Sequence, residues 1–153
     1  MSSKRLLRQS SFEEDPAAAW NAFLDVVAVH DPQMLDPSQI SAGLAFMYDS
    51  EVQNGGHFQY FENHGLGLVS ATIEALRVLG AISHAAILSE AGSVASEKDW
   101  GLISSPLRYV SEEAELDLTA LDDRYHLCSP TLEEYLVRHL SEHPEWYIEF
   151  GAA

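Results

Sequence analysis

Four residues in the middle of this sequence have the side-chain chemistry of metal ligands: His57, Glu62, His64 and His84. Imidazole and carboxylate groups are common ligands of zinc, manganese and iron. Their spacing matches no established motif such as His-Glu-x-x-His, although a turn between His57 and His64 would bring these two residues together. A metal-dependent enzyme or metal-binding protein is therefore an alternative reading. Our main reading assigns no catalytic residue, no metal and no other cofactor.

The single cysteine, Cys128, has a histidine two positions before it, His126. Residues so close in sequence generally do not act together as a nucleophile and its base, so we do not assign this pair a catalytic role. One cysteine also cannot form an internal disulfide. The basic residues Lys4, Arg5 and Arg8 are not followed by an apolar run of signal-peptide length. We therefore expect a reducing, cytoplasmic location.

Acidic residues dominate the charge of the chain. The 153 residues include 24 acidic and 8 basic ones, for a formal net charge of −16. Direct binding of nucleic acid needs Lys and Arg to neutralise phosphates, and an anionic membrane would repel this surface. We therefore expect neither nucleic acid nor a membrane as a direct partner. A basic protein is the expected partner, and solubility alone is the alternative explanation of the acidity.

Several carboxylates have the spacing of neighbours on a helix. Residues three or four apart on a helix have Cβ atoms about 5–6 Å apart, so rows of carboxylates can imitate the phosphates of a duplex. The alternative is a solvated acidic surface without a partner. The candidate partner-binding residues are Glu112, Glu113, Glu115, Asp117, Asp122, Asp123, Glu142, Glu145 and Glu149.

The elements that position these groups begin with a turn at Asn54-Gly55-Gly56. Asn and Gly adopt positive φ at low cost, so this triplet predicts the end of a helix that starts near Ser38. After the turn, Gln59 and Asn63 are four apart and share one face of a short helix. We expect their amides to bond to neighbouring backbone.

Two apolar helices follow the turn, over residues 66–79 and 81–88, and Gly80 joins them. The charges of Glu74 and Arg77 and the glycines interrupt the apolar run, so it is too short to span a membrane. A stretch that is apolar on every face belongs at the centre of a domain. This helix pair is therefore the predicted core.

Further helices are predicted from Pro16 to about residue 30, from about residue 110 to 125, and from Pro130 to about residue 143. No stretch shows a sustained two-residue alternation, which would indicate a strand. The sequence thus predicts an all-α protein with a single compact domain. We expect a flexible basic arm over residues 1–11 and a helical domain over residues 12–153.

Part of the sequence resembles a protein family named after a bacterial DNA-mimic protein. The similarity spans about residues 32–150 and is carried by Glu51-Val52, Asn54-Gly55-Gly56, Gln59-Tyr60-Phe61, Asn63, Gly65, Gly80-Ala81, Leu121-Asp122-Asp123-Arg124-Tyr125 and His143-Pro144-Glu145. His57 stands where a large apolar residue is expected. The structural residues of the motif are Asn54, Gly55, Gly56, Gln59, Asn63 and Gly80.

The resemblance implies an all-helical cytoplasmic domain. It also implies a non-enzymatic acidic interaction protein that occupies the DNA-binding face of a basic transcription regulator. A third alternative is that the protein is an immunity protein or regulatory partner of a basic toxin. It would then also bind through its acidic surface, but to a different target.

Overall fold

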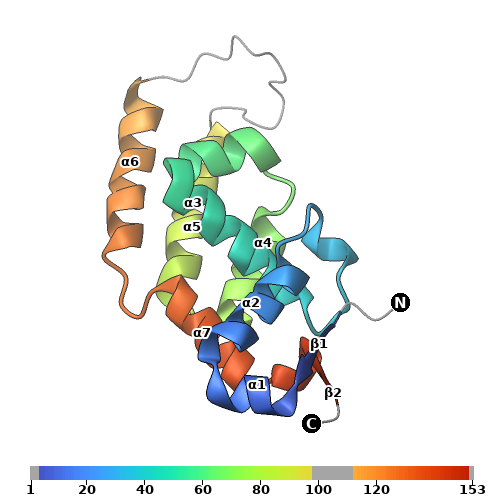
Figure 1. The fold of residues 1–153 in the computed structure, drawn as a ribbon. Coiled ribbons are helices and arrows are strands. Elements are labelled where there is room, and N and C mark those ends of the chain that lie inside the picture. The colour runs from blue at the N-terminus through green and yellow to red at the C-terminus, as the bar shows by residue number, and fades with distance from the viewer. Residues whose placement is uncertain (1–3, 98–111, 152–153) are drawn as a thin grey trace.

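The computed structural model describes residues 4–97 and 112–151, and helices account for most of them. The fold is all-α, as the sequence predicts, with one small two-stranded sheet (Figure 1). In chain order the elements are β1 (Arg5–Arg8), α1 (Gln9–Glu14), α2 (Pro16–Val27), the 3-10 helix η1 (Pro32–Met34), α3 (Ile40–His64), α4 (Val69–Val78), α5 (Ile82–Glu97), α6 (Glu112–His126), α7 (Leu132–Glu142), the 3-10 helix η3 (Pro144–Trp146) and β2 (Ile148–Gly151). None of the described helices combines the length and the apolar character that crossing a bilayer requires.

Helix α3 contacts more of the fold than its length alone would suggest. It packs against α2, η1, α4, α6 and α7. Its buried face alternates small residues such as Ala42 and Ala45 with the large side chains of Tyr48 and Val52. Small residues let neighbouring helices approach closely, while the large ones fill the space between them. The position of α3 therefore determines where α6 and α7 lie.

A kink divides α3 at Gly55 and Gly56. Their backbone angles are φ −150° and ψ 18° at Gly55, and φ 73° and ψ −174° at Gly56. This confirms the predicted end of the first helical segment at the glycines, because both residues leave the helical conformation and α3 consists of two helical segments joined there. The chain resumes the helical conformation at once and continues to His64, because one left-handed glycine redirects a helix without opening a loop.

The predicted pair of core helices is present as α4 and α5. Gly80 has φ 84° and joins them, and the N–H of Ala81 donates to the carbonyl of Leu76 across the turn. Leu76 and Leu88 are completely buried. Gly92 of α5 faces Val69 of α4, where a Cβ atom would be only 3.1 Å from the valine side chain. The two helices thus pack closely, and α5 in turn contacts α6.

Part of the predicted basic arm has regular secondary structure. Residues 5–8 form β1, which pairs in parallel with β2 in the register Arg5 to Ile148 through Arg8 to Gly151. The backbone N–H of Arg5 also donates to the carbonyl of Tyr147 at 2.9 Å. A strand whose partner lies at the other end of the chain leaves no local periodic signal, because the pairing is set by tertiary structure.

Aromatic residues near the end of the chain anchor this small sheet to the helices. Tyr147 is buried with its ring 4.8 Å from that of Phe23. Its hydroxyl lies 2.7 Å from Nε2 of His139 on α7. Burial, and secondly the nearby His143, lower the pKa of His139 to about 4, against the opposing effect of Glu142. His139 is therefore neutral at pH 7, and its Nε2 shares a hydrogen bond with the hydroxyl of Tyr147.

Acidification should destabilise the fold through His139. In the unfolded chain this histidine takes up a proton near pH 6.5, whereas in the folded chain it does so near pH 4. The unfolded state therefore binds more protons between these values, and stability falls by up to about 1.4 kcal/mol per pH unit across the window. We expect the melting temperature of His139→Gln to fall less than that of the wild type between pH 7 and pH 4.5. His30→Gln, at an exposed position, should keep the wild-type dependence, and equal losses in all three proteins would contradict this assignment.

Candidate functional site

Helix α6 carries most of the carboxylates that the sequence assigns to partner binding. Glu115, Asp117 and Asp123 are exposed, and none of the three forms an ion pair with a Lys or Arg of the described residues. Glu112 and Glu113 open the helix, but their side chains lie outside the described part of the structure. Asp122 differs from the others because its side chain is only 23% exposed. The helix thus presents several free carboxylates and holds one inward.

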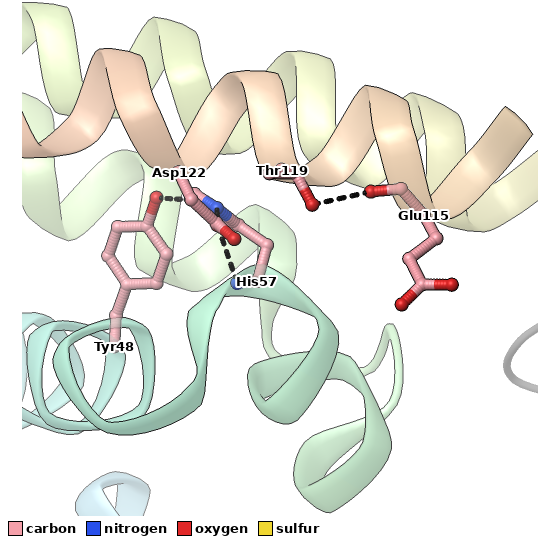
Figure 2. A network of polar contacts seen from close by, with 5 residues as sticks. All are labelled: Tyr48, His57, Glu115, Thr119 and Asp122. Carbon is pink, nitrogen blue, oxygen red and sulfur yellow. Dashed lines mark hydrogen bonds and ion pairs between the residues drawn. The ribbon is translucent and has the colours of Figure 1, made fainter. Parts of the chain in front are cut away.

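Asp122 connects α6 to the kink of α3 (Figure 2). Its Oδ1 atom accepts a hydrogen bond from the backbone N–H of His57 at 2.8 Å and lies 2.6 Å from Nδ1 of the same residue. On the other side of the ring, Nε2 of His57 lies 2.6 Å from the hydroxyl of Tyr48. A carboxylate can only accept, so Nδ1 carries the proton and donates it to Asp122. Nε2 then accepts a hydrogen bond from the hydroxyl of Tyr48.

The resulting Tyr48, His57 and Asp122 network is a structural clamp. Burial raises the pKa of Tyr48 well above its ordinary value, so its hydroxyl stays protonated and can donate a hydrogen bond. The side chains of Tyr48 and His57 are completely buried, and no reactant in solution reaches them. A buried histidine with both nitrogens bonded fixes the relative position of the two helices. The network therefore contributes to stability and orients α6.

A second contact between the same helices lies about one turn further along. The hydroxyl of Tyr125 on α6 donates to Oδ1 of Asp49 on α3. Burial, together with the negative charge of Asp49, raises the pKa of Tyr125, so the tyrosine remains the donor. Sequence reasoning missed these contacts. Asp122 and Tyr125 are three apart, which places both on one side of a helix, but nothing in the sequence specifies their partners.

Glu51 gathers the amide side chains that surround the kink. Its Oε2 atom accepts from Gln59 at 3.1 Å and from Asn63 at 2.7 Å, and Asn54 donates to Oε1 of Gln59 at 3.1 Å. The prediction that these amides bond to backbone is wrong for Gln59 and Asn63, because the kink turns them back toward the preceding helical segment. The contacts brace the two halves of α3, which explains why these residue types accompany the glycines.

The histidines that suggested a metal site do not converge as ligands, although His57 and His84 both pack against the ring of Tyr125. His57 belongs to the clamp, and Nε2 of His64 lies 3.5 Å from Oε1 of Glu51. His84 is buried against the ring of Tyr125, at 5.2 Å, and its Nδ1 has no hydrogen-bond partner among the described residues. Within residues 4–97 and 112–151, no three His, Cys, Asp or Glu side chains are arranged to hold a metal ion.

Cys128 does not face His126 as a nucleophile would face its base. Its thiol donates to the carbonyl of Arg124, and partial burial raises its pKa. A raised pKa favours the thiol over the reactive thiolate. The geometry thus gives no support to a nucleophilic pair at this position.

The carboxylates near the end of the chain do not form the expected helical row. Helix α7 ends at Glu142, Glu145 lies in η3 and Glu149 in β2. The helical spacing assumed for these three residues fails because His143 leaves the helical conformation and Pro144 starts a separate turn. Glu142 also lies 3.9 Å from Arg138 and is thereby partly neutralised. Figure 1 shows β2 at the far end of the fold from the start of α6.

The arginines of the described residues are largely committed to individual carboxylates. Arg124 pairs with Glu90, Arg77 with Glu74, and Arg5 lies 4.0 Å from Asp25. Each pair joins one positive and one negative charge, so it leaves the net charge of the surface unchanged. The excess of carboxylates is therefore left facing solvent, including Glu115, Asp117 and Asp123 on α6.

Replacing Asp122 should destabilise the fold much more than replacing its neighbour. Asp122→Ala leaves the backbone N–H and the ring Nδ1–H of His57 buried without an acceptor, which should cost about 2–4 kcal/mol. Asp123→Ala removes an exposed carboxylate and should change stability by less than about 0.5 kcal/mol. Urea unfolding of both variants measures the difference. Similar losses in the two proteins would contradict the clamp.

Gly56 should be equally intolerant of a side chain. Gly56→Ala places a Cβ atom at a residue with φ 73° and drives it into the carboxylate of Asp122. The backbone conformation alone costs about 1–2 kcal/mol, and displacement of Asp122 adds to that cost. Gly67→Ala is the matched control, because no atom lies within 4 Å of the added carbon. Its melting temperature should stay near the wild-type value, whereas that of Gly56→Ala should fall by several degrees.

The match to a protein-family model covers both polar networks. The model described as DMP19-like protein matches residues 33–143, a range that includes the α3 kink, the α4 and α5 pair and the clamp to α6. No curated protein and no solved structure gives a significant match to the chain. The matched range spans well over half of the sequence, and the chain belongs to the DMP19-like protein family.

Proposed function

We propose that this protein is a non-enzymatic, cytoplasmic DNA mimic that occupies the DNA-binding face of a basic transcription regulator. The observation that carries the proposal is membership of a family named after a DNA-mimic protein. Such a protein needs no catalytic group and no cofactor. It needs carboxylates on a rigid support, placed where a basic surface would otherwise contact phosphates.

The charge of the chain supports this role. A net charge of −16 provides long-range attraction to a basic partner, and it repels nucleic acid itself. Docking of carboxylates on a DNA-binding face would replace its phosphate contacts one for one. The affinity should then fall steeply with salt, as it does for DNA.

Helix α6 is the best-supported docking element. It lies at the edge of the fold, on the left in Figure 1, and its exposed carboxylates project from more than one side. Asp117 and Asp123 are six apart, and Glu115 lies seven residues before Asp122 on the side of the clamp. The bonds of Asp122 and Tyr125 to α3 hold the helix in place. Binding would therefore order few backbone segments, which limits its entropic cost.

Capture of the partner tests the proposed role. Immobilised protein is incubated with a lysate of the host cell, and retained proteins are eluted with increasing salt. We expect a DNA-binding protein that elutes at moderate salt and that duplex DNA releases. Recovery of partners that duplex DNA does not displace, a basic toxin included, would contradict DNA mimicry.

Charge-neutralising variants test the role of α6 once that partner is in hand. The first variant combines Glu115→Gln, Asp117→Asn and Asp123→Asn. The control combines Glu62→Gln, Glu74→Gln and Glu97→Gln, which removes the same charge from exposed positions outside the candidate partner-binding residues. The first should weaken binding at least about tenfold and flatten the dependence of log K on log salt, while the control should have a smaller effect. Equal effects would mean that net charge, and not α6, governs the contact.

A further inference from the structure

An apolar cavity of about 420 Å³ lies between the N-terminal helices and α7. Its walls include Phe12 of α1, Pro16, Ala17 and Trp20 of α2, and Val137 and Leu140 of α7. The hydroxyl of Ser141, which also reaches the cavity, already donates to the carbonyl of Arg138. The walls therefore offer an apolar side chain good contacts and a polar one almost none. Figure 1 shows α1, α2 and α7 gathered at one end of the fold, away from the start of α6.

The cavity has the size and rigidity of a binding site. Its volume falls in the range of about 300–1,000 Å³ that is usual for small-ligand pockets. The ring of Trp20 stacks on Phe23 at 5.1 Å, and Phe23 is completely buried, so one wall is fixed to the core. Val137 on the opposite wall is 49% exposed. Apolar walls left open to solvent in this way mark an interaction site.

Exposed carboxylates lie next to the wall residues in the sequence, although Glu13 accepts from Gln9 and Asp15 from the N–H of Ala17. Glu13, Glu14 and Asp15 lie between Phe12 and Pro16 in the sequence and are all exposed. Glu133 is exposed one helical turn before Val137 on α7. Arg138, next to Val137 on α7, donates to the carbonyl of Leu79 and lies over the ring of Tyr135.

We propose that this cavity receives one or two apolar side chains from a Lys- and Arg-rich segment of a protein partner. The apolar walls would select the side chains, and the exposed carboxylates next to the wall residues would attract the cations that flank them. The proposal rests on the proposed function for the basic character of the partner, and it adds a second contact remote from α6. Charge brings the two proteins together, while a buried apolar anchor supplies affinity and register.

Short peptides test the chemistry of the cavity directly. The probe is a capped hexapeptide, Lys-Lys-Phe-Leu-Lys-Lys, titrated into the full protein while tryptophan fluorescence is followed. We expect a saturating change with a dissociation constant below about 1 mM. Lys-Lys-Ser-Ser-Lys-Lys lacks the anchor and Glu-Glu-Phe-Leu-Glu-Glu lacks the cations, so both should bind at least about tenfold more weakly. Equal binding of the serine peptide would reduce the effect to general charge attraction and overturn the proposal.

A matched pair of variants places the peptide in the cavity. Val137→Asn makes the wall polar without adding charge and should weaken binding of the Phe-Leu peptide about tenfold. Ile82→Asn changes a residue that is 61% exposed on α5, outside the cavity walls, and should leave binding unchanged. Circular dichroism checks that both proteins are folded. Equal affinities for the two variants would overturn the proposal.

The outcomes separate this inference from the proposed function. A partner that duplex DNA displaces, and that binds Val137→Asn and wild type equally, would leave the DNA mimic intact and eliminate the cavity as its anchor. Selective peptide binding that Val137→Asn abolishes, in a protein that captures no DNA-binding partner, would support the cavity and contradict DNA mimicry.

Discussion

The fold depends on a carboxylate that satisfies two donors at the corner of its longest helix. Asp122 accepts from the backbone N–H and the ring of His57, directly after the left-handed Gly56. The corner exposes a backbone donor that the helix itself cannot satisfy, and α6 brings the acceptor. Glycine is needed there both for its positive φ and because a Cβ atom would displace the carboxylate. The backbone conformation of Gly56 and the docking of α6 through Asp122 therefore depend on each other.

The same constraint separates two kinds of carboxylate on one helix. Asp122 is bonded inward and shapes the fold, whereas Glu115, Asp117 and Asp123 are exposed and free to meet a partner. Tyr125, whose pKa burial raises, and Asp49 secure the helix a turn further on. An acidic surface that imitates duplex DNA needs such support, because a mobile helix carrying the carboxylates would lose conformational entropy on binding. Under the proposed function, the buried polar network would hold in place the helix that carries the surface charge.

Periodicity and glycine chemistry were enough to predict the all-α class, the break at Gly55 and Gly56 and the helix pair joined at Gly80. These features depend on residues close in sequence. The contacts of His57 with Asp122, of Tyr125 with Asp49 and of β1 with β2 join distant segments, and no local pattern specifies such partners. The supposed row at Glu142, Glu145 and Glu149 failed for a local reason, since the helix stops before Pro144. Gly56 was recognised as a turn residue, but the carboxylate that fills the space beside it was not.

The pairing of β1 with β2 joins the first and the last described elements of the fold. Residues 5–8 and 148–151 pair through backbone hydrogen bonds, and the ring of Phe12 in α1 meets that of Phe150 in β2 edge-on at 5.1 Å. Neither strand pairs with a further strand among the described residues, so loss of one leaves the other without its ladder. Fraying of either strand would therefore remove the hydrogen-bond partners of the other, so the two strands should open together.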